Sequence, residues 1–312
     1  MRDIVKMVDV FRPPPPLIGV GHSFGGAAVV NAALFNPRLF TAVVLLDPVI
    51  SRYASTPGEI KDGPAAASIH RRDVWPSLDA AAASFRRSPF YRAWDPRVLD
   101  LWLAHGVVPA DEEGEGAVAL ATTKHQEVFT YLRPSWMSFD PAGKTFQDRS
   151  RATPDLAPSF EGPGGRFNLT WPFYRAEPTS TLTKLPSLRP GAFYIFGGTS
   201  KLSPEEFAEE KLSKTGTGVG GSGGKAAGRV DGVTHDQAGH LIPLEIPGFC
   251  AEKAAPWIKG ELDRWWAEER EYEAWTRKSQ AEKTTISDEF ARYAGRPDGK
   301  AVKKVSKDKA KL

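Results

Sequence analysis

A glycine-flanked serine lies between a strand pattern and a helix pattern in the segment PLIGVGHSFGGAAVVNAALFNP, residues 16–37. The apolar residues 17–20 predict a short buried strand. The small residues of 25–35, followed by the helix-stopping pair Asn36 and Pro37, predict a helix. A strand that runs directly into a helix leaves the serine on a very tight turn. This turn constrains the fold more than any other feature of the chain.

Strand patterns recur along the chain with helix patterns between them. The run TAVVLLDP at 41–48 is apolar and β-branched, and it follows the first helix closely. Strand, helix and strand in such short succession predict parallel pairing through a right-handed crossover, with both faces of the sheet buried. Further strand patterns at 191–198 and 228–240 precede an amphipathic helix that includes Trp257 and Trp266. The expected fold class is α/β, with a mostly parallel sheet.

The long segment between these strands has a different character. Residues 51–185 are Ala-rich and Trp-containing, and loops rich in Pro and Gly interrupt them. Because a chain of 312 residues is near the upper size of a single core, we expect one core with an insertion. The core comprises 1–50 and 186–295, the insertion is a mostly helical cap, and the polar residues 296–312 are a disordered basic tail.

The net charge of +3 is unevenly distributed. Residues 296–312 hold six lysines and one arginine against two aspartates, a net charge of +5 that leaves −2 for the rest of the chain. A slightly acidic folded body argues against nucleic-acid binding. The single cysteine, Cys250, fits a reducing intracellular compartment. No apolar run approaches the ~18 residues that a membrane span needs, so no transmembrane segment is expected.

The segment Gly21-His22-Ser23-Phe24-Gly25 satisfies the pattern G-x-S-x-G, and the predicted strand and helix supply the context that this pattern requires. A serine on such a turn has strained backbone angles, so Gly21 and Gly25 are expected to supply space that bulkier residues would fill. The Ser23 hydroxyl then projects above the sheet. The Phe24 backbone N–H, at the positive end of the helix, points to where an oxyanion would form.

A serine is a weak nucleophile at neutral pH, so a histidine base is expected late in the chain, after a strand. His240 has this placement in AGHLIPLEIP, before the last helix. His235 shares the loop and is the alternative. The other histidines lie within the turn or in the expected cap: His22, His70, His105 and His125.

Two positions offer the acid that would orient the imidazole. Asp47 ends the second strand at the carboxyl edge of the sheet, where sites gather, although an Asp-Pro pair also forms structural turns. The turn after residues 191–198 carries no acid, and the nearest carboxylates there are Glu205 and Glu206. Asp47 is the better candidate, with Glu205 as the alternative.

The glycine-rich segment GTGVGGSGGK matches G-x-G-x-x-G at Gly216, Gly218 and Gly221. It follows a helix pattern, whereas a dinucleotide-binding loop follows a strand. Lys225 is followed by Ala226, where a phosphate-binding loop requires Ser or Thr. We therefore expect a flexible connection whose first glycine ends the preceding helix. Neither a cofactor nor a metal is predicted.

Together these residues resemble the α/β-hydrolase superfamily, and more closely the fungal hydrolases grouped with peroxisomal lipases and host-selective toxin biosynthesis proteins. The likeness extends over nearly the whole chain, in the order GVGHSFGG, NPRLFTAVVLLDPVI, TKHQEVFTYLRP, YIFGGTSKLSPEE, KTGTGVGGSGG and GHLIPLEIP. It implies an α/β-hydrolase fold with Ser23 as nucleophile, His240 as general base and Asp47 as the acid after the sixth strand. It further implies that Phe24 donates an oxyanion hydrogen bond, and that a reaction of the serine esterase or lipase type transfers an acyl group from an ester or thioester to water.

The tripeptide Ala310-Lys311-Leu312 resembles the type 1 peroxisomal targeting signal, as a variant of Ser-Lys-Leu. The resemblance implies an import receptor as a partner and the peroxisome as the location, with the cytoplasm as the alternative.

Members of the superfamily have several strands before the nucleophile, whereas 22 residues precede Ser23 here. By the resemblance, the N-terminal strands and the loop that supplies a second oxyanion donor are missing, as in an incomplete gene product or a truncated paralogue. Two functions follow as expectations. One is a serine hydrolase that cleaves small-molecule esters or thioesters with lipid-like or secondary-metabolite acyl groups. The other is a catalytically inactive hydrolase-like protein that binds an acyl ligand or a partner.

Overall fold

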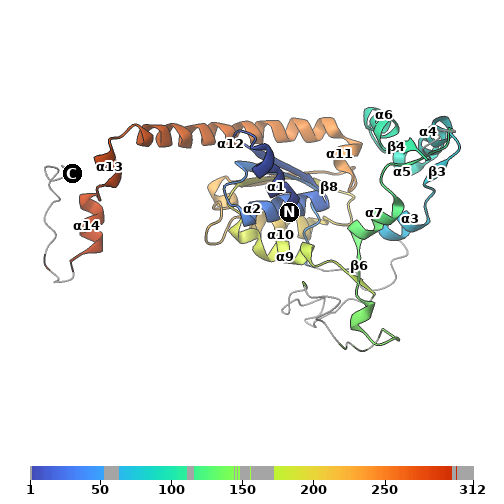
Figure 1. Cartoon of the computed structure of the whole chain (residues 1–312), viewed down its shortest axis with the longest axis horizontal. Coiled ribbons are helices and arrows are strands. Elements are labelled where there is room, and N and C mark those ends of the chain that lie inside the picture. The colour runs from blue at the N-terminus through green and yellow to red at the C-terminus, as the bar shows by residue number, and fades with distance from the viewer. Residues whose placement is uncertain are drawn as a thin grey trace. The chain divides into compact units, whose positions relative to one another are not determined.

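The computed structural model describes residues 2–52, 63–110, 116–143 and 172–296, with the single residues 145, 147, 155 and 300 (Figure 1). Contacts divide the chain into two units, 1–261 and 262–312. The tripeptide Ala310-Lys311-Leu312, with most of the expected disordered tail, lies outside the described residues.

Four parallel strands form the main sheet of the first unit, in the order β1-β2-β8-β9. They are β1 (Ile18–His22), β2 (Ala42–Leu46), β8 (Gly191–Gly197) and β9 (Val230–His235). The register pairs Ile18 with Ala42, Ala42 with Gly191, and Ala192 with Val230. Because the strands are parallel, their carboxyl ends share one edge of the sheet, which is where sites form in such folds. The α/β fold class expected from the sequence is confirmed.

Side chains along the strands alternate between the two faces of the sheet. In β2, Val43 and Leu45 belong to one apolar cluster, whereas Val44 and Leu46 belong to another. Because both faces are covered, β2 is an unbroken apolar run in which every residue is buried. The structure therefore explains why the sequence shows a continuous apolar pattern there and not an alternating one.

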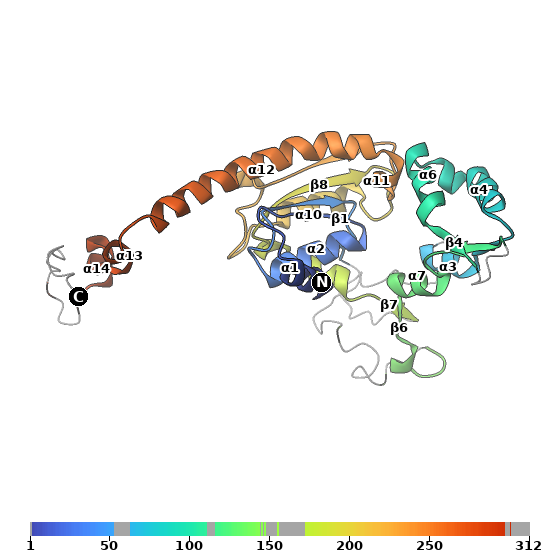
Figure 2. The same cartoon turned by 45° about the horizontal axis from the view of Figure 1, so that its top comes forward.

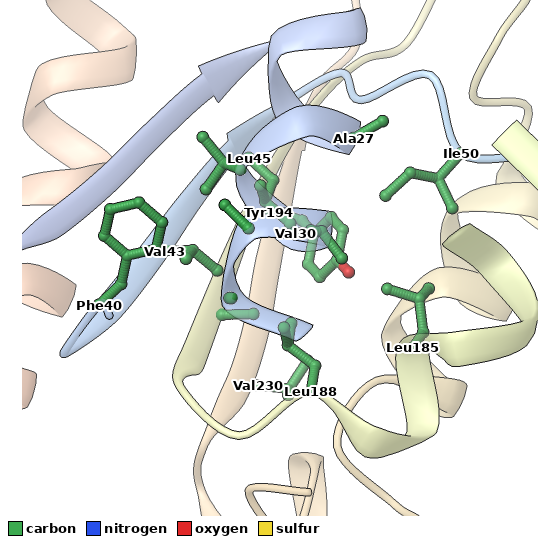
Figure 3. Packing of buried hydrophobic residues seen from close by; sticks show 14 of the residues in the cluster. Ala27, Val30, Phe40, Val43, Leu45, Ile50, Leu185, Leu188, Tyr194 and Val230 are labelled. Carbon is green, nitrogen blue, oxygen red and sulfur yellow. The ribbon is translucent and has the colours of Figure 1, made fainter. Parts of the chain in front are cut away.

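Helices cover both faces. The first cluster is drawn in Figure 3, where Val30 and Leu185 lie around the ring of Tyr194. Its helices are α2 (Phe24–Phe35), α9 (Glu177–Lys184), η2 (Leu185–Ser187) and α10 (Glu205–Lys214), with α1 (Arg2–Phe11) packed at its margin. The second face is covered by α11 (Ile242–Glu245) and the first turns of α12 (Pro247–Thr276). Figure 2 shows α2 and these turns of α12 on opposite sides of the strands.

Short helices and strands make up the part of the chain where a cap is expected. They are α3 (Pro64–His70), β3 (Val74–Trp75), α4 (Leu78–Arg87), α5 (Pro89–Arg92), α6 (Pro96–His105), β4 (Val107–Pro109), β5 (Val118–Leu120), α7 (Lys124–Tyr131), β6 (Arg133–Pro134), η1 (Trp136–Ser138) and β7 (Phe173–Tyr174). The strands form an antiparallel sheet in the order β3-β5-β4 and a β6-β7 pair. A separate apolar cluster surrounds Phe85, whose ring lies 5.0 Å from that of Trp75 and 4.7 Å from that of Tyr91. The boundaries of the cap at residues 51 and 185 stay a prediction.

The glycine-rich segment after α10 is a folded loop and not the flexible connection expected. Gly216 has a φ of 73°, and it follows the helix end at Thr215, so the first glycine does end the helix. The Gly216 N–H donates to Leu185 O over 2.9 Å, and the Gly218 N–H donates to Pro186 O over 2.8 Å. A Cβ atom at Gly221 would lie 2.3 Å from Pro186 O. The glycines therefore allow the loop to pack against η2, and η3 (Lys225–Ala227) then leads into β9.

The second unit begins within α12 and adds two short helices, α13 (Gln280–Thr284) and α14 (Asp288–Ala294). Ser279 caps α13, where its side chain and that of Glu282 form reciprocal hydrogen bonds with the backbone. No helix in the described ranges combines the length and the apolar character that crossing a membrane requires.

The core can be tested at Leu185, which is fully buried in the cluster of Figure 3. Leu185→Ala should lower the free energy of unfolding by about 2–5 kcal/mol, because it leaves a cavity. Val219, in the glycine-rich loop, is 98% exposed. Val219→Ala should change that free energy by no more than ~0.5 kcal/mol. Chemical denaturation followed by tryptophan fluorescence measures both, and equal effects would contradict this packing.

Candidate active site

The turn between β1 and α2 holds Ser23 in a strained backbone conformation. Its φ of 56° and ψ of −125° are rare for a residue that carries a Cβ atom. The Ser23 N–H donates to Leu46 O over 3.1 Å, and Ser23 O accepts from the N–H groups of Gly26 at 3.1 Å and Val49 at 3.0 Å. The chain at and just beyond the end of β2 therefore supports the turn.

Close backbone approach requires glycine at two positions of this turn. A Cβ atom at Gly21 would lie 2.6 Å from Gly25 O, and one at Gly26 would lie 2.7 Å from Pro48 Cβ. A Cβ atom at Gly25 would meet nothing within 4 Å. The expectation that Gly25 supplies the space is therefore wrong, since Gly26 has that role.

Ser23, Asp47 and His240 come together at the carboxyl edge of the sheet. His240 Nε2 lies 2.9 Å from Ser23 Oγ, and His240 Nδ1 lies 2.6 Å from Asp47 Oδ2. The Asp47 N–H donates to Ile195 O over 2.8 Å, which fixes the residue between β2 and β8. With the proton on Nδ1, the imidazole donates to the carboxylate and accepts from the serine hydroxyl. This is the arrangement that a serine nucleophile and its base require.

The alternative residues lie in other surroundings. His235 ends β9 and packs its ring against Phe249, with centroids 4.8 Å apart. Glu205 begins α10, and it is Asp47 that lies beside His240. Phe24 is the first residue of α2, so its backbone N–H is one of the helix donors that have no intrahelical acceptor.

Asp47 is buried, with 0% of its surface exposed. Burial alone would raise the pKa of its carboxyl group, but hydrogen bonds from His240, Ser200 and Ser203 outweigh burial and lower that pKa below its ordinary value. The Ser200 hydroxyl donates to Oδ2 over 2.6 Å, and His240 Nδ1 contacts the same oxygen. Because its pKa is lowered, the carboxylate is ionised at neutral pH.

Known proteins resemble the chain both in sequence and in structure. Type I acyl-CoA thioesterase mpaH of Penicillium roqueforti is 34% identical over 293 aligned residues, which cover 87% of this chain and 65% of that protein. Abhydrolase domain-containing protein AFT2-1 of Alternaria alternata is 28% identical over 254 residues, covering 80% of this chain and 86% of that protein. Among solved structures, the peroxisomal alpha-beta-hydrolase Lpx1 of Saccharomyces cerevisiae matches with a TM-score of 0.56 and 13% identity, over 92% of this chain and 69% of that one. No family model matches.

The chain has an α/β-hydrolase fold like that of Lpx1, and its sequence is similar to those of the thioesterase and abhydrolase relatives. It spans 65% of the length of the thioesterase relatives. Ser23, Asp47 and His240 follow one another in the chain in the order that nucleophile, acid and base have in α/β hydrolases.

Two glycines, the last residue of β8 and the one after it, allow the loop that carries His240 to approach. A Cβ atom at Gly197 would lie 2.1 Å from Gly239 O, and one at Gly198 would lie 2.7 Å from Asp236 Cα. Thr199 binds the same loop, because both its N–H and its hydroxyl donate to Ala238 O over 3.0 Å. The signal for this role was the glycine pair that directly follows an apolar strand.

His22 also supports the site, although the sequence analysis placed it only within the turn. Its Nε2–H donates to the backbone carbonyl of His240 over 2.8 Å, and the two rings lie 5.0 Å apart. Burial lowers the pKa of His22, so its imidazole is neutral at pH 7 and adds no charge beside His240. Its position inside G-x-S-x-G was the available signal.

The turn can be tested by three glycine-to-alanine variants. Gly21→Ala and Gly26→Ala should each lower the free energy of unfolding by more than ~2 kcal/mol, because the added methyl group meets the turn's backbone or Pro48. Gly25→Ala should cause no loss, because the added methyl group meets nothing and alanine favours a helix by ~0.5–1 kcal/mol. Thermal unfolding of the three variants measures this order. A Gly25→Ala variant as unstable as Gly21→Ala would refute the geometry described for the turn.

Proposed function

We propose that this protein is a serine hydrolase that cleaves an acyl thioester or ester through an acyl-enzyme intermediate. The observation that carries the proposal is the hydrogen-bonded series from Ser23 Oγ to His240 and from His240 to the buried Asp47. Such a series activates a serine because the imidazole can take the hydroxyl proton while the carboxylate stabilises the imidazolium that forms.

The proposed first half-reaction begins when Ser23 Oγ attacks the carbonyl carbon of the substrate and His240 Nε2 accepts the serine proton. Asp47 stays ionised and orients His240 through Nδ1. The oxyanion forms near the first turn of α2, where the Phe24 N–H and the positive end of the helix stabilise negative charge. Collapse of this intermediate expels the thiol or alcohol, which takes the proton from His240.

The second half-reaction uses water as the nucleophile. His240 accepts a proton from water as the water oxygen attacks the acyl-serine carbonyl. The resulting tetrahedral intermediate releases the carboxylic acid, and the proton returns to Ser23 Oγ. Each cycle consumes one water molecule and leaves His240 neutral, ready for another substrate.

A thioester is the substrate class we favour. The support is the similarity to the mpaH relatives, which are named type I acyl-CoA thioesterases. Because the chain spans 65% of their length, thioesterase activity is a proposal for this chain. Lipid-like or secondary-metabolite acyl groups and a peroxisomal address read by an import receptor remain predictions of the sequence.

An active-site fluorophosphonate probe tests the proposal directly. The wild-type protein should be labelled, whereas Ser23→Gly and Ser23→Ala should not be, because both lack the attacking oxygen. Ser23→Gly is the better control for folding, since glycine adopts the φ of 56° without strain and the variant should be at least as stable as the wild type.

Asp47→Asn should reduce the rate of hydrolysis by about 10⁴-fold, because it loses the charge that stabilises the imidazolium.

Two substrates with the same medium-chain acyl group then distinguish the substrate classes. One is the acyl-CoA thioester, whose hydrolysis is followed by release of the free thiol, and the other is the nitrophenyl ester. A folded wild-type protein that binds an acyl ligand but is neither labelled nor active would refute the enzyme proposal. Such a result would favour the inactive, ligand-binding alternative.

A further inference from the structure

One lysine is buried close to the site, and the proposed reaction does not use it. Lys211 lies on α10 and is only 1% exposed. Its Nζ donates to Leu202 O over 3.4 Å and to Ser203 Oγ over 3.3 Å, and lies 5.5 Å from the centroid of the Phe196 ring. Lysine is almost never fully buried unless a negative charge compensates it. Lys211 therefore requires a compensating negative charge.

The charges of two carboxylates, Asp47 and Glu210, favour the charged form of Lys211. Glu210 is already paired with other cations. It precedes Lys211 on α10 and forms ion pairs with Arg52 at 2.7 Å and Lys214 at 2.8 Å. Asp47, from the end of β2, accepts hydrogen bonds from the imidazole of His240 and from serine hydroxyl groups. Asp47 is therefore the carboxylate whose charge is left for Lys211 to balance.

The segment between β8 and α10 connects the two charges. The Ser200 hydroxyl donates to Asp47 Oδ2 over 2.6 Å and accepts from the Leu202 N–H at 3.2 Å. Leu202 O and Ser203 Oγ, from the same turn, accept hydrogen bonds from Lys211 Nζ. The ammonium group therefore holds the turn that carries Ser200 to the carboxylate.

We propose that Lys211 is a positioning residue that acts on the reaction through Asp47, by holding the turn of Ser200 and by contributing a buried positive charge to the surroundings of the carboxylate. The inference rests on the proposed function. In the reaction, this charge helps to keep Asp47 ionised and aimed at His240 Nδ1, while Lys211 itself touches no reacting atom.

The charge is present at neutral pH and lost in mild alkali. Burial lowers the pKa of Lys211 to about 8, while the charges of Asp47 and Glu210 act in the opposite direction. The charged form is therefore fully present well below pH 8 and disappears as the pH rises through that value. Any contribution of the charge to the reaction must disappear over the same interval.

The test compares Lys211→Met with the wild type in the full-length protein. Methionine has a similar length but no charge and no donor, so kcat should fall by about tenfold at pH 7, equivalent to ~1.4 kcal/mol in activation free energy. KM should stay unchanged. The wild-type kcat should also fall between about pH 7 and 9 towards the level of the variant, whereas the variant should show no such alkaline step. Lys184→Met, at the exposed end of α9, is the matched control and should keep the wild-type profile.

The kinetic readouts separate positioning from a merely structural role. Removing one member of a buried pair leaves the other charge uncompensated, so Lys211→Met should lower the melting temperature, and kcat is compared at a temperature where both proteins are fully folded. A variant that loses stability but keeps the wild-type kcat and alkaline step would overturn the proposal.

A readout independent of turnover keeps this inference separate from the proposed function. NMR titration of the Asp47 carboxyl carbon should give a higher pKa in Lys211→Met than in the wild type. An unchanged Asp47 titration would refute the link to Lys211 even in an active enzyme. A shifted titration in a protein without hydrolase activity would instead support the link and refute the proposed function.

Discussion

Asp47 carries its negative charge in a position without solvent contact, and three separate segments of the chain meet there to satisfy it. Ser200 comes from the turn after β8, His240 from the loop after β9, and the Asp47 backbone is held by β8 itself. A buried carboxylate without such partners would be strongly destabilising. The parallel sheet makes the meeting possible, because it delivers the carboxyl ends of all these strands to one edge.

The same edge is crowded with backbone, and glycine makes the crowding possible. Gly21 and Gly26 let the start of α2 lie against β1 and Pro48, while Gly197 lets the loop of His240 lie against β8. The strain at Ser23 is maintained by hydrogen bonds from its neighbours on β2 and α2. Placement of the serine hydroxyl is therefore the result of tight backbone packing.

The sequence predicted the elements that local patterns control. Ser23 and His240 could be found because each follows a recognisable strand, and Asp47 could be proposed for the same reason. The choice between Asp47 and Glu205 depends on which turn approaches the imidazole, and this is a property of strand order that no local pattern contains. The space attributed to Gly25 belongs to Gly26, because the path of α2 against Pro48 decides it.

Long-range packing also explains the other differences. The glycine-rich loop is not the flexible connection expected from its local sequence, because its hydrogen-bond partners in η2 lie some thirty residues earlier in the chain. His22 was overlooked because its acceptor is a backbone carbonyl 218 residues away. Lys211 lies in a charged helical stretch, EEFAEEKLSK, whose composition suggests solvent exposure. Only the fold shows that this one lysine faces inward.

β9 is the last strand of the four-stranded sheet in the described part of the chain, and the loop of His240 follows it directly. Ser23 and Asp47 belong to the contiguous β1-α2-β2 segment, whereas His240 is separated from Asp47 by 193 residues. Outer strands open locally more readily than central ones. A brief opening of β9 would withdraw the imidazole from the hydroxyl and the carboxylate. The rate of amide hydrogen exchange along β9 would therefore report how often the site comes apart, separately from the global stability of the fold.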